Sequence, residues 1–123
     1  MRRIALALLL AAAPAAAQPV IDAPLEGETD LGVLAPRCAG MMFLIAGGDP
    51  NPDIPLFTVG LVGATVQARE EAGLPVEEED VKAAVFAYTD AYRALIDAEA
   101  YDILEADRAF CLSLGLAVSN ASE

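Results

Sequence analysis

The chain has 123 residues, with 19 Asp and Glu against seven Lys and Arg, and its formal net charge is −12. His is absent, which excludes Ser–His and Cys–His nucleophile pairs, His-ligated zinc and an imidazole pH switch. Nucleic acid is not an expected partner, because binding to phosphates needs clustered Lys and Arg. Apolar residues make up 56% of the chain, too many for a disordered protein, and the length indicates one small domain.

Residues 1–17 have the three parts of a signal peptide. Two arginines stand near the start, residues 4–13 are apolar, and residues 15–17 (Ala-Ala-Ala) form a small-residue cleavage site. A membrane anchor needs about 20 apolar residues, and this run is shorter and interrupted by Pro14. We therefore expect cleavage after Ala17, a periplasmic or secreted protein, and no stable membrane insertion after cleavage. The remaining five basic and 19 acidic residues would give a net charge of −14.

The chain has two cysteines, Cys38 and Cys111. An oxidising compartment favours their pairing, and their spacing excludes a Cys-x-x-Cys redox centre. The alternative is a pair of buried free thiols that behave as small hydrophobic residues. A disulfide would close a loop of about 74 residues and remove on the order of 4 kcal/mol of unfolded-chain entropy, so we expect a structural staple.

The mature chain is expected to begin with a mobile N-terminal arm over residues 18–29, which contain two Pro and one Gly and show little periodicity. A helical domain then covers residues 30–116. Residues 38–46 are apolar on every face, which is typical of a helix enclosed by others.

Three large side chains in this apolar segment are the candidate partner surface: Met41, Met42 and Phe43. Met is flexible and polarisable, so it suits an adaptable binding surface. The alternative is that the three fill the core, with helical rotation directing one of them outward unless a neighbour covers it.

The glycine- and proline-rich segment 47–53 predicts a turn, followed by a helix that continues to Ala72 and stops at Gly73. Asp53 is placed to cap this helix. A strand is the alternative, because residues 57–62 include several with good β propensity. The spacing of the apolar residues favours the helix.

A weak candidate metal site lies in the same turn. Asp49, Asn51 and Asp53 match the first half of an EF-hand calcium loop, in which alternate oxygens surround one cation. The second half fails, since Ile54 stands where the loop needs Gly and Gly60 where it needs a bidentate Glu. We therefore expect a helix-capping turn and no metal or other cofactor.

The strongest periodic pattern follows residues 77–80, four consecutive acids that suit the first turn of a helix. Apolar side chains recur there at spacings of three and four: Val81, Val85, Tyr88, Tyr92, Leu95 and Ile96. A break near residues 97–100 separates this helix from a fourth, which should end at Gly115 before a frayed tail at 117–123. The sequence therefore predicts an all-α fold, a small single domain of about four helices stapled by one disulfide.

The residues offer no complete catalytic set. No Asp or Glu lies inside an apolar run, Ser113 has no visible base, and Lys82 follows four acids. The leading hypothesis is an exported, acidic, non-catalytic protein that binds another protein, through a basic surface on that partner. The alternatives are a small hydrolase or lyase that uses carboxylates alone, and a periplasmic holdase that responds to acid stress.

Overall fold

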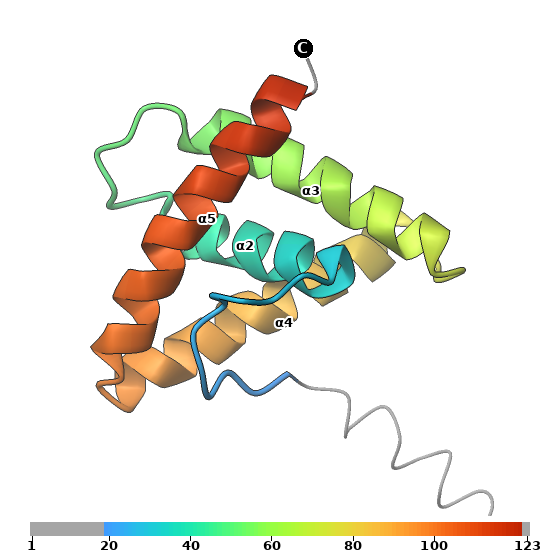
Figure 1. The fold of residues 1–123 in the computed structure, drawn as a ribbon. Helices are drawn as coiled ribbons and strands as arrows, with labels where there is room; N and C mark the ends of the chain where they lie inside the picture. The colour runs from blue at the N-terminus through green and yellow to red at the C-terminus, as the bar shows by residue number, and fades with distance from the viewer. Residues whose placement is uncertain (1–18, 122–123) are drawn as a thin grey trace, which may run out of the picture.

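The computed structural model describes residues 19–121, so the expected signal peptide lies outside the described residues. This part of the chain has four helices and no strand, which confirms the all-α prediction. Figure 1 shows their arrangement, with α2 in the middle of the molecule. The helices are α2 (Leu31–Ile45), α3 (Ile54–Glu71), α4 (Glu78–Asp97) and α5 (Tyr101–Ala121).

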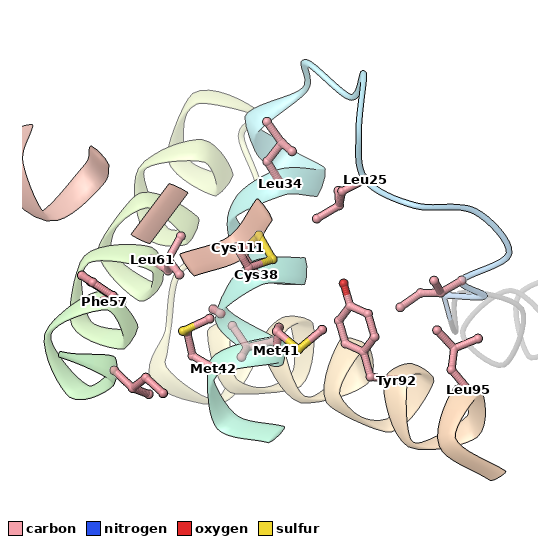
Figure 2. Packing of buried hydrophobic residues seen from close by; sticks show 14 of the residues in the cluster. Leu25, Leu34, Cys38, Met41, Met42, Phe57, Leu61, Tyr92, Leu95 and Cys111 are labelled. Carbon is pink, nitrogen blue, oxygen red and sulfur yellow. A yellow bond between two sulfur atoms is a disulfide. The ribbon is translucent and has the colours of Figure 1, made fainter. Parts of the chain in front are cut away.

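The central helix α2 is enclosed because it packs against all three other helices. Every residue from Leu34 to Met42 is buried except Arg37, in agreement with the apolar pattern of this segment. Figure 2 shows Met41 and Met42 of α2 within the cluster of buried side chains, which includes Leu61 of α3 and Tyr92 of α4. The hydrophobic core therefore surrounds α2.

Local signals set the ends of the helices. The Asp30 carboxylate caps α2 by accepting a hydrogen bond from the Gly32 N–H at 2.9 Å. Asp53 stands at the N-cap of α3, but its side chain makes no capping hydrogen bond. Gly73 has a φ of +73°, the left-handed conformation expected just beyond α3. The strand alternative for residues 57–62 is wrong, because they lie within α3.

Two glycines allow the helices to cross closely. A Cβ atom on Gly40 of α2 would lie 2.8 Å from the Val85 carbonyl oxygen of α4. A Cβ atom on Gly115 of α5 would lie 2.7 Å from Cβ of Phe57 in α3. The prediction that Gly115 ends the last helix is wrong, because α5 continues through it to Ala121. Residues 117–121, expected as part of a frayed tail, are therefore helical.

The segment before α2 is packed against the helices, which corrects the prediction of a mobile arm. Ile21 and Leu25 are 5% and 1% exposed and belong to the hydrophobic core. The Leu25 N–H donates a hydrogen bond to the Asp107 carboxylate of α5 at 2.8 Å. Two apolar anchors and one buried hydrogen bond hold this segment, so the packed domain includes residues that precede position 30.

Candidate functional site

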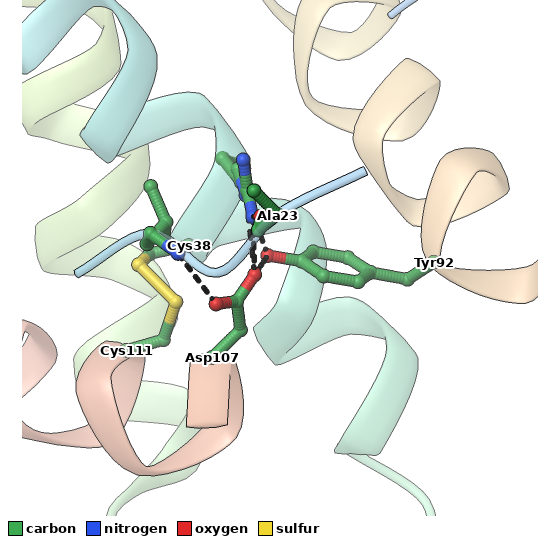
Figure 3. The surroundings of a disulfide bond; sticks show 7 residues. Ala23, Cys38, Tyr92, Asp107 and Cys111 are labelled. Carbon is green, nitrogen blue, oxygen red and sulfur yellow. Dashed lines mark hydrogen bonds and ion pairs between the residues drawn. A yellow bond between two sulfur atoms is a disulfide. The ribbon is translucent and has the colours of Figure 1, made fainter. Parts of the chain in front are cut away.

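A buried polar cluster, formed by Arg37, Tyr92 and Asp107, joins three helices (Figure 3). Arg37 of α2 donates to Asp107 Oδ2 of α5 from Nη2 at 2.6 Å and from Nε at 3.2 Å. The Tyr92 hydroxyl of α4 donates to the same oxygen at 2.7 Å. The other oxygen, Oδ1, accepts from the Leu25 N–H. Arg37 also donates to the Ala23 carbonyl oxygen at 2.7 Å, so the cluster fixes the N-terminal segment as well.

The polar cluster is suited to holding the fold together rather than to catalysis. The Asp107 side chain is 1% exposed, and both its oxygens already accept hydrogen bonds. Burial by itself lowers the pKa of Arg37, but the hydrogen bonds with Asp107 and Tyr92 outweigh it and leave that pKa above its usual value. Arg37 therefore remains charged opposite the carboxylate. Asp107 is buried although it does not lie inside an apolar run of the sequence.

Tyr92 should set an alkaline limit to stability. Burial, followed by the hydrogen bond with Asp107, raises the pKa of its hydroxyl well above the ordinary value of 10.0. The unfolded chain therefore releases this proton at a lower pH than the folded protein does. The stabilising contribution is complete below about pH 10 and is lost as the pH rises toward the folded-state pKa.

Urea denaturation between about pH 8 and 11 measures this effect. The free energy of unfolding should fall above about pH 10, and the fall should be smaller in Tyr92→Phe. An identical fall in both proteins would show that Tyr92 is not the group responsible.

The predicted disulfide is present and lies beside the polar cluster. Cys38 of α2 and Cys111 of α5 are bonded, with their Cα atoms 5.0 Å apart, and both residues are 0% exposed. Arg37 directly precedes Cys38, and Asp107 lies one helical turn before Cys111. The covalent bond and the Arg37–Asp107 ion pair therefore join α2 to α5 at the same place, and Figure 3 shows Asp107 beside the bonded cysteines.

The three residues of the candidate partner surface differ in their exposure to solvent. Met41 and Met42 are 1% and 0% exposed, so their assignment to a partner surface is wrong. Phe43 is 41% exposed and packs edge-to-face against Phe86 of α4, with ring centroids 4.9 Å apart. Successive helical residues differ in direction by about 100°, so Phe43 leaves the core although its two predecessors fill it.

Phe43 lines a hollow of about 510 Å³ that we call the Phe43 groove. Its walls come from the end of α2, the middle of α3 and the start of α4, together with the short connection before α4. They are mainly apolar: Phe43, Val62, Val66, Val76, Val81, Val85 and Phe86. Glu78 and Lys82 are the charged lining residues, and they pair with each other at 3.1 Å.

The polar side chains of the weak candidate metal site form hydrogen bonds and an ion pair that stabilise the turn. Asp49 Oδ1 accepts from the Asn51 N–H, and Asn51 Oδ1 accepts from the Asp53 N–H, both at 2.9 Å. Asp49 Oδ2 pairs with Arg108 of α5 at 2.5 Å. The hydrogen bond from Asn51, then that from Arg108, lowers the pKa of Asp49. Within residues 19–121, no three His, Cys, Asp or Glu side chains are grouped so that they could hold a metal ion.

Sequence reasoning found the disulfide and one wall residue of the groove, but it missed Arg37, Asp107 and Phe86. Arg37 and Asp107 lie close to the two cysteines in sequence, but this spacing alone does not predict an ion pair. Comparison with protein families, curated proteins and solved structures finds no match for this chain. None of the helices between residues 19 and 121 has the length and apolar character to cross a membrane.

Proposed function

We propose that this chain is an exported, non-catalytic protein that binds a partner protein through the Phe43 groove. The observation that carries the proposal is the pair of exposed aromatic rings, Phe43 and Phe86, set in an apolar hollow. Large aromatic side chains are common anchors of binding energy in protein interfaces. A groove between helices also suits the apolar face of an amphipathic helix, a common mode of recognition.

Charge defines the expected partner. The chain carries a net charge of −12, and the first turn of α4, at one edge of the groove, has three exposed or partly exposed acids, Glu78, Glu79 and Asp80. Lys82 pairs with Glu78, and its single positive charge does not neutralise all three acids. A helix with apolar side chains on one face and Lys or Arg beside them fits both the groove and its acidic edge.

Carboxylate-based catalysis, an alternative function, has less support. Asp107 and Asp49 are each paired with an arginine, at 2.6 Å and 2.5 Å. A catalytic acid or base needs a carboxylate that can reach a substrate proton. The geometry of these two residues favours a structural role.

A designed peptide tests the binding proposal. A helical peptide of Leu and Lys should bind the protein, and the matched peptide of Leu and Glu should bind at least about tenfold more weakly because its charges are repelled. Isothermal titration gives the affinities, and amide NMR signals locate the site. Raising the salt concentration should weaken the binding of the Leu–Lys peptide.

Two variants distinguish binding in the Phe43 groove from nonspecific binding. Phe86→Glu places a charge in the groove, whereas Leu116→Glu changes a residue of α5 that is also exposed, at 51% against 40% for Phe86. The first should abolish binding of the Leu–Lys peptide, and the second should leave it unchanged. Equal loss in both variants, or NMR shifts away from Phe43 and Phe86, would overturn the proposal.

A further inference from the structure

A second cleft, of about 420 Å³, is lined by the C-terminal half of α3, by α4, by the N-terminal part of α2 and by Pro19. We call it the Arg69 cleft. Its walls include small apolar side chains, Ala68 and Ala72 from α3 and Ala84 and Ala87 from α4. Arg69 and Tyr88 are also among its lining residues. This volume is within the range of about 300–1,000 Å³ that is typical of small-molecule sites, which also combine apolar walls with a few polar groups.

Arg69 differs from the other basic side chains of the described chain. Within residues 19–121, four of the five basic residues form an ion pair with a carboxylate: Arg37, Lys82, Arg93 and Arg108. Arg69 forms no such pair there. Its Nε donates to the Pro75 carbonyl oxygen at 2.8 Å, which fixes the side chain. Its terminal nitrogens make no hydrogen bond to the described residues and remain available to a ligand.

We propose that the Arg69 cleft binds a small monocarboxylate with an apolar body, whose carboxylate pairs with the Arg69 guanidinium. A guanidinium presents parallel N–H donors that match the two oxygens of a carboxylate. The alanine side chains leave room for the apolar body and would be shielded from water by it. Tyr88 lines the same cleft and adds an aromatic side chain to its wall.

The surrounding charge favours a single negative charge over a phosphate dianion. An adjoining hollow shares Gly32, Ala68, Ala72 and Leu74 with the Arg69 cleft and is also lined by Asp30 and Glu71. The chain as a whole carries a charge of −12. Each additional negative charge on a ligand therefore increases the repulsion that Arg69 has to overcome.

Octanoate is a suitable probe, with octanamide as its neutral counterpart and inorganic phosphate as an anion without an apolar body. NMR titration of the full exported chain should show octanoate shifting the signals of Arg69, Ala87 and Tyr88. Isothermal titration should give at least about tenfold weaker binding for octanamide and for phosphate.

Three variants test the site. Arg69→Gln removes the guanidinium, Ala87→Leu fills the cleft, and Arg93→Gln removes an equal charge from the exposed pair with Asp90 on α4. The first two should weaken octanoate binding at least about tenfold, and the third should leave it within about twofold. Circular dichroism should show that each variant keeps its helices.

Several results would overturn this proposal. They are no octanoate binding by the wild-type chain at millimolar concentration, equal binding of octanamide, and equal weakening in Arg93→Gln. If octanoate shifted only the NMR signals of Phe43 and Phe86, it would bind in the Phe43 groove and not in the Arg69 cleft. Phe86 lines the Phe43 groove and does not line the Arg69 cleft, so loss of peptide binding in Phe86→Glu and loss of octanoate binding in Arg69→Gln are separate outcomes.

Discussion

Replacing Asp107 with Asn is expected to lower the free energy of unfolding by about 3–5 kcal/mol, because the change removes one partner of a buried ion pair. The Arg37 side chain is 11% exposed and would keep its charge with little water to solvate it. In either orientation the amide nitrogen of Asn would face a donor, either the Leu25 N–H or the groups of Arg37 and Tyr92. Stability is typically about 5–15 kcal/mol for a small domain, so this loss is a large fraction of the whole. Urea denaturation at pH 7, followed by circular dichroism, measures it.

The matched controls separate the buried pair from charge loss in general. Asp90→Asn removes the same charge from an exposed pair on α4 and should cost less than about 1 kcal/mol. The double variant Arg37→Met with Asp107→Leu removes both buried charges and should be more stable than Asp107→Asn alone. A cost for Asp107→Asn as small as that for Asp90→Asn would contradict a structural role for the polar cluster.

The helices could be predicted because their signals are local. The α4 stripe recurs every three or four residues, and Val81, Val85, Tyr92 and Leu95 are buried as its period requires. The α2 segment is apolar on every face, and this property alone placed it at the centre of the molecule. The disulfide followed from having only two cysteines near opposite ends of the predicted domain.

The polar cluster could not be predicted in the same way, because its partners are far apart in sequence. Arg37 and Asp107 are separated by 70 positions, and neither lies in a recognisable motif. The packing of the N-terminal segment could not be predicted for the same reason. Leu25 reads as part of an irregular segment, yet its N–H bonds to Asp107 across 82 positions. A helix-ending glycine and a helix-crossing glycine also look alike in sequence, and only the contact of Gly115 with Phe57 distinguishes them.

The Phe43 groove could be predicted only in part. Helical rotation predicts that one of three successive large residues points outward, and Phe43 does so. The sequence does not reveal the partner ring, because Phe86 follows 43 positions later on another helix. The packing of α4 against α2 creates the pair, and with it the candidate binding site.

Reduction of the Cys38–Cys111 bond is expected to lower the free energy of unfolding by about 2–5 kcal/mol. The bond links residues 73 positions apart, so it strongly restricts the unfolded chain. Cys111→Ser should have a comparable effect. Urea denaturation of the oxidised and reduced protein measures the difference, and thiol alkylation verifies the redox state. Two reactive thiols in protein purified without reductant would show that the bond does not form.

The disulfide and the polar cluster should also depend on each other. Asp107 lies one turn from Cys111, and Arg37 lies next to Cys38, so each connection holds the other in position. Residues that share a site usually give non-additive effects, with coupling of about 0.5–3 kcal/mol. Reduction should therefore destabilise Asp107→Asn by a different amount from the wild-type chain. Asp90→Asn, an exposed change on α4, should lose the same amount as wild type. Equal losses in all three proteins would show that the bond and the ion pair stabilise the junction of α2 and α5 independently.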